Sequence, residues 1–300
     1  MWEDRPATKE PMTFIERLLT AFIDTSAIRT VCCALGPYRN LTTLTASILA
    51  LHPDCRVLNH GGKKVFNDPH VDFLTNPSRR GLDLFVRYAL FLSRRRRRGG
   101  SGGSITASHA FERSAMRQAY VSRYGKNRNK RRPVCLFWKE SQMLTNVLRR
   151  CDTDLGALLE RHEPLRFLMP VRNPLDCAHS NMKTGHVSHL PSVDGSSSFD
   201  QVLGAILEEL RWFLDLRKRY PDRFFCYFQN AFDTTLLQTL AAFLCLPADR
   251  QWMTAVEEAY SVKSPYRHAP ARMATYQGLV DKLFAPYPEE QRALRGFIAP

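Results

Sequence analysis

The sequence has 300 residues, of which 44% are hydrophobic, and its formal net charge at pH 7 is +14. This length and apolar content suffice for one large domain with a complete core, and they exclude an intrinsically disordered chain. A basic excess of this size requires an anionic partner, and a nucleic acid, an anionic lipid, an acidic polymer or a polyphosphorylated small molecule would each satisfy it.

Neither export nor a membrane span is expected for this chain. Its apolar runs are all shorter than the roughly 20 residues that a membrane-spanning helix needs. The N-terminal segment MWEDRPATKE is polar and acidic, unlike a secretory signal. The eight cysteines form no CxxC pair and no Cys/His group at zinc spacing. We therefore expect buried free thiols in a cytoplasmic protein that binds no metal.

Hydrophobic periodicity predicts helices that alternate with strands. The first helix is expected at 12–27, where Phe14, Leu18, Ala21 and Phe22 have helical spacing. Further helices are expected at 41–51, 70–93, 108–123, 141–160, from 174 onward, at 199–219 and at 233–244, with a mostly helical remainder. Apolar runs bounded by turn residues predict strands at 30–35, 55–58, 134–138, 165–171 and 223–228. The pattern is typical of a single α/β domain over 1–300, with a mostly parallel five-stranded sheet covered by helices on both faces.

Two basic segments interrupt this pattern. Arg94–Arg98 is followed by GGSGGS, and the composition of about 94–104 is typical of a flexible, solvated loop. The second segment is GKNRNKRRP, which includes Lys126–Arg132. A nucleic-acid-binding module is one interpretation of these runs. Because no known nucleic-acid motif and few aromatic residues accompany them, we expect no nucleic-acid partner.

The first candidate site is the turn GPYRNLTTL (36–44), between a predicted strand and a predicted helix. Ligands of parallel sheets bind at the carboxyl ends of the strands. A helix start there presents free backbone N–H groups and a positive dipole end to an anion. Arg39 adds a forked charged donor, and Thr42 and Thr43 add hydroxyl groups. The turn therefore predicts a phosphate cradle, although ordinary helix capping would also explain the threonines.

The second candidate site is FLMPVRNPLDCAHS (167–180), at another turn from a predicted strand to a predicted helix. Asn173 is suited to cap a helix, Pro174 to its first position and Asp176 to its third. A capped helix does not by itself explain Arg172 at the strand end or Ser180 eight residues later.

These two turns resemble the donor-binding motifs of sulfotransferases that use 3′-phosphoadenosine 5′-phosphosulfate (PAPS), in the bacterial, cytosolic or carbohydrate-type branches. The family's 5′-phosphosulfate loop reads K/R-S-G-T-T. Arg39 takes its basic position and Thr42 and Thr43 its paired threonines, while Asn40 replaces the Ser and Leu41 the Gly. The Walker A pattern of P-loop kinases is absent.

The resemblance extends to the second turn and to the C-terminal part of the chain. RNPLDCAHS is similar to the segment in which an Arg and a Ser hold the 3′-phosphate of PAPS, here Arg172 and Ser180. FFCYFQNAFDTTLLQTLAAFLCLP (224–247) is similar to a third segment of the family, with Cys245 in place of a Gly. The family's late R-K-G loop is missing. The residues that would replace it are Lys263, Arg267 and Arg272.

The resemblance implies a metal-independent transfer of the sulfuryl group from PAPS to a hydroxyl or amine. Arg39 would stabilise the leaving phosphate, and Lys139, at a strand end, would contact the bridging oxygen. His60 is the expected general base, with Glu140 and His109 as rivals.

The acceptor is expected to be a carbohydrate, a glycolipid or another small molecule. Segments 60–130 and 185–200 are expected to line its site, and their basic residues favour an anionic acceptor or association with an anionic surface. Two alternatives stay open. One is a P-loop nucleotide kinase. The other is a catalytically inactive, nucleotide-binding relative of sulfotransferases, which would be consistent with Leu41 and the missing R-K-G loop. The oligomeric state is not predicted.

Overall fold

The computed structural model describes residues 12–75, 78, 80–95, 100–112, 115–125, 132–150 and 153–298. Within them, six strands form one sheet in the order β3-β2-β4-β1-β5-β6. The strands are β1 (Thr30–Ala34), β2 (Cys55–Asn59), β3 (Gly103–Ser104), β4 (Cys135–Lys139), β5 (Leu165–Val171) and β6 (Phe224–Phe228). All neighbouring strands are parallel except β2 and β3. The α/β prediction with a mostly parallel sheet is confirmed, with six strands where five were expected.

The additional strand is β3, at the edge of the sheet. It lies inside the segment 94–104 that was predicted to be a flexible loop, and it pairs with Leu58 and Asn59 of β2. The backbone N–H of Ser104 also donates to the carbonyl oxygen of Arg95 at 2.9 Å. A strand of only two residues has no apolar alternation, so hydrophobic periodicity could not reveal it. Residues 96–99 of the same segment lie outside the described part of the chain.

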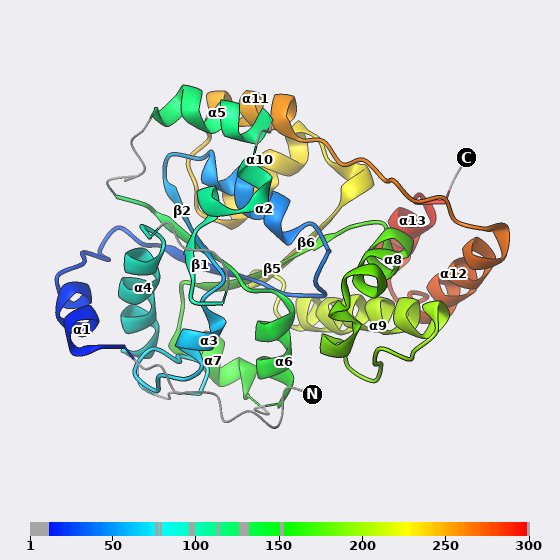
Figure 1. Ribbon diagram of the computed structural model, residues 1–300, viewed down its shortest axis with the longest axis horizontal. Helices are drawn as coiled ribbons and strands as arrows, with labels where there is room; N and C mark the ends of the chain where they lie inside the picture. The colour runs from blue at the N-terminus through cyan, green and yellow to red at the C-terminus, as the bar shows by residue number, and fades with distance from the viewer. Residues whose placement is uncertain are drawn as a thin grey trace.

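Helices cover both faces of the sheet (Figure 1). On one side the described helices are α2 (Thr42–Ala50), α5 (Ala115–Tyr124), α10 (Thr234–Phe243) and α11 (Arg250–Ala259). The opposite side carries α4 (Gly81–Leu92), α6 (Gln142–Arg150), α7 (Leu155–Arg161), α8 (Pro174–Thr184), α9 (Phe199–Arg219), α12 (Pro270–Leu283) and α13 (Pro288–Arg295). The short α1 (Phe14–Ala21) packs beside α4, and α3 (Gly62–Val65) follows β2. Single turns of 3-10 helix lie at Ile105–Ala107, His109–Phe111, His186–His189 and Gln229–Ala231.

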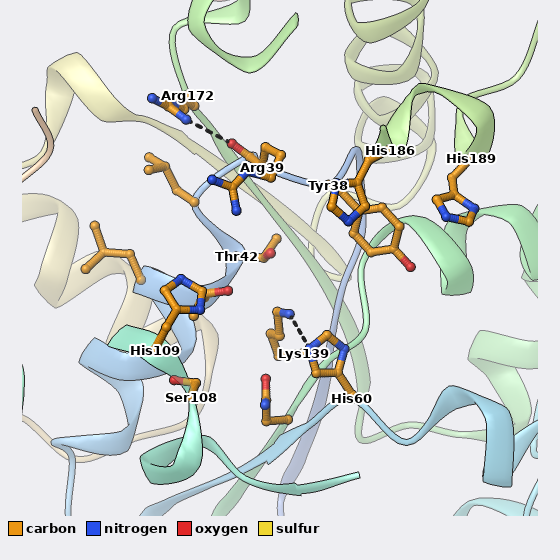
Figure 2. A pocket seen from close by; sticks show the side chains of 14 residues that line it. Tyr38, Arg39, Thr42, His60, Ser108, His109, Lys139, Arg172, His186 and His189 are labelled. Atoms are coloured by element: carbon orange, nitrogen blue, oxygen red, sulfur yellow. Dashed lines mark hydrogen bonds between the residues drawn. The ribbon is translucent and has the colours of Figure 1, made fainter. Parts of the chain in front are cut away.

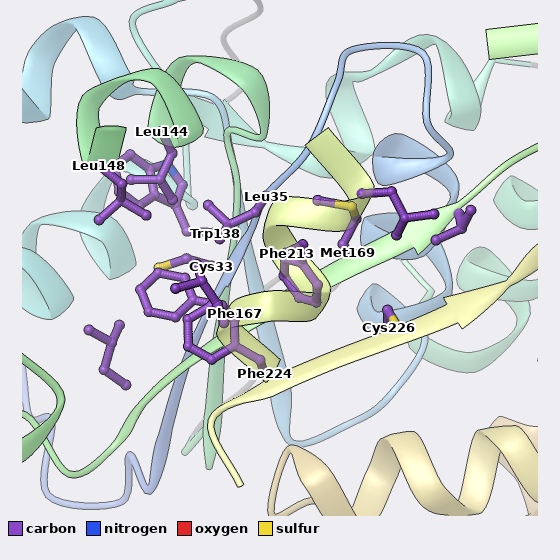
Figure 3. Close-up of a cluster of buried hydrophobic side chains, with 14 of the residues drawn as sticks. Cys33, Leu35, Trp138, Leu144, Leu148, Phe167, Met169, Phe213, Phe224 and Cys226 are labelled. Atoms are coloured by element: carbon purple, nitrogen blue, oxygen red, sulfur yellow. The ribbon is translucent and has the colours of Figure 1, made fainter. Parts of the chain in front are cut away.

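Alternation along the central strands divides the core into two layers. Cys33 of β1, Trp138 of β4 and Phe167 of β5 belong to the layer under α4, α6 and α9. Their neighbours Cys32 and Phe137 belong to the layer under α2, α5 and α10. Figure 3 shows the first layer, where the rings of Phe167 and Phe224 stack with centroids 4.9 Å apart. Both faces of the sheet are therefore buried, which is why the strands read as unbroken apolar runs.

Four predicted helices differ from the structure. The helix expected at 12–27 spans Phe14–Ala21. Of the described residues in 70–93, Gly81–Leu92 form the helix, and before it the side chain of Asp72 accepts the backbone N–H groups of Leu74 and Thr75 and holds a turn. The predicted helix 141–160 is divided into α6 and α7. The helix expected from 108 begins at Ala115, after the 3-10 turns. By contrast, β5 and α9 have the predicted bounds to the residue.

Seven of the eight cysteines lie in the described residues as free thiols. Six of them are buried and Cys245 is exposed, while Cys151 lies outside the described residues. Among the described residues, no helix is long and apolar enough to cross a membrane. The same residues contain no group of three or more His, Cys, Asp or Glu side chains that could hold a metal ion.

Candidate active site

One cavity of about 520 Å³ opens where the carboxyl ends of four parallel strands meet. β1 lies between β4 and β5, and β2 follows β4, so the turns after these strands converge on one edge of the sheet. Figure 2 shows the side chains that line the cavity. They are Tyr38, Arg39, Leu41, Thr42, Thr43, Leu44, Asn59, His60, Ser108, His109, Lys139, Arg172, His186 and His189. The expected site residues Arg39, Leu41, Thr42, Thr43, His60, Lys139 and Arg172 are among them.

The turn after β1 contains three residues with positive φ: Gly36, Arg39 and Leu41. Gly36 has φ +96°, a conformation that residues with a side chain rarely adopt, and a Cβ there would lie 2.8 Å from the methyl carbon of Met169, so the position favours glycine. Arg39 and Leu41 have φ values of 64° and 61°, in the left-handed region that non-glycine residues rarely adopt. Leu41 thus has the left-handed conformation that glycine adopts most readily, at a cost of roughly 1 kcal/mol. Replacement of the expected glycine by Leu41 has not removed this backbone shape.

The N-terminus of α2 is uncapped by any side chain. Its N-cap residue is Leu41, which offers no hydrogen-bond acceptor in its side chain. The first backbone N–H groups of a helix have no partner within the helix, and they carry a partial positive charge. Thr42 and Thr43 lie at this helix start and line the cavity. The arrangement suits an anion, because an anion would satisfy the N–H groups that a capping side chain normally binds.

Hydrogen bonds join the turn after β1 to the turn after β5 and to the helix α8 that follows it. Arg39 Nε donates to Ser180 Oγ at 2.8 Å, and the backbone N–H of Arg172 donates to Asn40 Oδ1 at 2.8 Å. Arg172 Nη1 also reaches the carbonyl oxygen of Arg39, at 3.5 Å (Figure 2). Asn181 Nδ2 donates to the carbonyl oxygen of Tyr38 at 2.8 Å. The two motifs therefore form one unit, in which Asn40 and Ser180 are buried and Arg39 and Arg172 face the cavity.

The start of α8 holds Arg172 in place. Asn173 accepts the N–H of Leu175 at 3.0 Å as the predicted cap, and Pro174 takes the first helical position. The buried Asp176 does not complete a capping box. One of its oxygens lies 3.4 Å from Arg172 Nη2 and the other 2.9 Å from His268 Nε2. Arg172 Nε is buried and has no hydrogen-bond partner among the described residues.

The late segment 260–269 reaches the same region through residues that were not predicted. Besides His268, Tyr266 approaches, with its ring 4.3 Å from that of His179 and 6.0 Å from the guanidinium carbon of Arg172. Lys263 and Arg267 are exposed and do not line the cavity. Arg272 is on α12, over the ring of Phe199 at 4.4 Å.

Lys139 and His60 form a hydrogen-bonded pair on the floor of the cavity (Figure 2). Lys139 Nζ lies 3.2 Å from His60 Nε2. Burial lowers the pKa of Lys139 to about 8; the negative charge of Glu140 opposes this shift and the positive charge of Arg39 adds to it. At neutral pH the ammonium group is still charged and donates to Nε2. A neutral His60 ring then carries its own proton on Nδ1.

Glu140 lies beneath this pair and is buried. Its Oε1 is 3.9 Å from His60 Nδ1, and its Oε2 accepts the backbone N–H of Gly62 at 2.8 Å. Glu140 does not line the cavity, whereas His60 and its rival His109 do. This position suits Glu140 to orient His60, and it leaves the two histidines as the candidates that can meet an acceptor.

The opposite wall consists of three aromatic rings. The ring of Tyr38 makes edge contacts with those of His186, at 5.2 Å, and His189, at 5.4 Å. Burial lowers the pKa of both histidines, and the charges of His189, Arg39 and Lys139 lower that of His186 further. Burial also raises the pKa of Tyr38. The wall is therefore uncharged at neutral pH.

The sequence placed segment 185–200 at the acceptor site without singling out His186 or His189. Their spacing of three residues, in HVSH, is the only feature that could have indicated a shared face. Tyr38, Asn59 and Ser108 were not predicted. Asn59 Oδ1 and Ser108 Oγ are buried without a hydrogen-bond partner among the described residues, which only the packed structure reveals.

No protein-family model matches this chain, and no curated protein is detectably similar to it in sequence. The solved structures that resemble it in fold include two sulfotransferases. Mouse sulfotransferase SULT7A1, crystallised in complex with PAP, has 12% identity and a TM-score of 0.42, with 95% of this chain and 94% of that chain covered. The sulfotransferase from Alicyclobacillus acidocaldarius has 15% identity and a TM-score of 0.36, with 89% and 94% covered. Similarity at this level does not assign an activity to the chain.

Proposed function

We propose that this protein is a sulfotransferase that uses PAPS and transfers its sulfuryl group to a hydroxyl or amine of an acceptor. The observation that carries the proposal is the direct bonding of two anion-binding turns. Arg39 donates to Ser180, and Asn40 accepts from the backbone of Arg172, beside a cavity that Lys139 and His60 also line. A donor that carries phosphate groups on the 3′ and the 5′ position of one ribose requires two such turns at a fixed separation.

The residues present suit both ends of such a donor. The uncapped start of α2, with Arg39, Thr42 and Thr43, is suited to the 5′-phosphosulfate. Arg172, with its unpartnered Nε, and Ser180 are suited to the 3′-phosphate. Ser180 accepts from Arg39, so its own hydroxyl proton remains free to donate. Because Lys263 and Arg267 do not line the cavity, we assign them no donor contact.

Bound PAPS would supply an activated sulfuryl group whose departure leaves a phosphate oxygen. Arg39 and the N–H groups of α2 would stabilise the negative charge that develops there. Lys139 would donate to the leaving oxygen in place of His60 Nε2, which its charged state at neutral pH permits. Nε2 of His60 is then free to take the proton of the acceptor, while Glu140 faces Nδ1.

For the acceptor we propose a carbohydrate, a glycolipid or another small hydroxyl compound. The uncharged wall of Tyr38, His186 and His189 supports this, since aromatic rings pack against the apolar side of such molecules and ring nitrogens bond hydroxyl groups. The charges of Arg39, Lys139 and Arg172 favour anionic members of these classes. Equal turnover of a neutral phenol and an anionic glycan would argue against that preference.

The direct test is calorimetric titration of the protein with adenosine 3′,5′-bisphosphate. Arg172→Ala should weaken binding by at least about 2 kcal/mol, because a charged donor to a phosphate is lost. Arg161→Ala, which alters an exposed arginine at the end of α7, should bind like the wild type. Absence of binding to the wild type would refute the proposal.

Activity assays separate the alternatives. Transfer of labelled sulfuryl from PAPS that persists with a metal chelator supports a sulfotransferase. Binding without transfer to any acceptor of a broad panel would favour an inactive relative. Phosphoryl transfer from ATP that the chelator abolishes would favour a nucleotide kinase.

A further inference from the structure

The first described helix, α1, exposes its apolar side to solvent and buries polar residues, the reverse of an ordinary surface helix. Five large apolar side chains face solvent: Phe14 is 81% exposed, Ile15 67%, Leu18 52%, Leu19 52% and Phe22 83%. The side that packs against the protein carries Glu16 and Thr20, which are buried. A surface helix normally buries its apolar stripe. We call these five side chains the outer face of α1; Figure 1 shows the helix at the edge of the molecule, beside α4.

Polar contacts fix this orientation. Glu16 pairs with Arg95 at 2.8 Å and with Lys64 of α3 at 3.6 Å. Its carboxylate also accepts the N–H of Thr13 at 3.1 Å, which completes a capping box at the helix start. At the other end, Arg87 of α4 donates to the carbonyl oxygens of Ala21 and Ile23. Turning the apolar side inward would break these bonds, so the fold itself holds the apolar side of α1 toward solvent.

The neighbourhood of the outer face is basic. The described residues of segments 12–29 and 80–95, which hold α1 and α4, include six arginines and three acids. The arginines are Arg17, Arg29, Arg80, Arg87, Arg94 and Arg95, and the acids are Glu16, Asp24 and Asp83. Glu16 is buried and Asp83 pairs with Arg87, which leaves Asp24 as the exposed acid among the described residues of the two segments.

We propose that the outer face of α1 docks on an anionic lipid surface, with its apolar side chains in the interface and the arginines on the headgroups. An exposed apolar patch marks a contact surface, and an apolar face bordered by arginines matches a bilayer with acidic headgroups. A second copy of the chain fits less well, since a symmetric contact would bring two arginine-rich borders together. The proposal is independent of the donor chemistry.

The test is co-sedimentation of the full-length chain with lipid vesicles. The wild type should bind vesicles of phosphatidylcholine mixed with phosphatidylserine and not vesicles of phosphatidylcholine alone, and added salt should weaken binding. The double variant Phe14→Ser/Phe22→Ser should bind at least about tenfold more weakly, because two exposed phenyl rings no longer enter the interface. Its melting temperature should not fall, since both side chains are exposed.

A matched control is Val121→Ser/Met182→Ser, which removes exposed apolar side chains from α5 and α8. It should bind like the wild type. Three results would overturn the proposal: no binding of the wild type to the anionic vesicles, equal binding of both double variants, or a wild-type dimer in analytical ultracentrifugation that Phe14→Ser/Phe22→Ser abolishes. The last would identify the face as a dimer interface.

Discussion

Arg39 Nε donates to Ser180 Oγ at 2.8 Å, although 141 residues separate them in the chain. The contact exists because β1 and β5 are parallel neighbours, so the turns that follow them emerge side by side. It fixes the guanidinium group of Arg39 against α8 before any ligand binds. A preorganised charge costs less entropy at the moment of binding.

Ser180→Ala should weaken the binding of adenosine 3′,5′-bisphosphate roughly tenfold, because a hydrogen bond to a charged group and a hydroxyl donor are both lost. Calorimetric titration measures the change. The matched control is Ser122→Ala, at an exposed position of α5. If both variants bound with wild-type affinity, Ser180 would have no part in holding the ligand.

His60→Asn should lower kcat by roughly 10²–10⁴-fold while the affinity for adenosine 3′,5′-bisphosphate stays within a factor of about two, because a general base acts on the acceptor and not on the donor. His70→Asn, at an exposed position, is the control. If His60→Asn kept its activity and His109→Asn lost it, His109 would be the general base.

Donor affinity should decrease as the pH rises through about 8, because Lys139 loses its proton there. Lys139→Arg should flatten the pH profile, since a guanidinium group stays charged. Burial lowers the pKa of Lys139 from 10.5, so its contribution to stability is greatest above about 10.5 and is lost as the pH falls through about 8. Deprotonation of Lys139 therefore does not destabilise the protein, and a fall in donor affinity with rising pH would not come from unfolding. An unchanged profile in Lys139→Arg would contradict the assignment.

Cys245→Gly should raise the free energy of unfolding by roughly 1 kcal/mol, because Cys245 has a left-handed backbone at the end of α10 and glycine adopts it without strain. The side chain is exposed, so little packing is lost. Urea denaturation measures the difference. Cys245→Ala keeps the Cβ atom and should show no comparable gain; an equal gain would point to the thiol rather than to the backbone.

Local sequence was enough to predict the elements whose ends are set by their own residues. The apolar run of β5 is followed by Arg172, Asn173 and Pro174. Asn favours the N-cap and Pro the first position of a helix, and the structure begins α8 there. The capping box at Ser198 and the amphipathic pattern behind it likewise set the start of α9. The cavity-lining residues Arg39, Thr42, Thr43, Lys139 and Arg172 were found because each lies where a predicted strand ends or a predicted helix begins.

Tertiary structure decided what depends on packing between distant elements. The edge strand β3 exists only because β2 pairs with it. The uncharged wall of Tyr38, His186 and His189 requires the turn after β1 to meet the segment after α8. Apolar spacing predicted α1 correctly as a helix but not which side faces outward. The ion pairs of Glu16 with Lys64 of α3 and with Arg95, in the bend after α4, set that orientation. Periodicity within one segment carries no information about such partners.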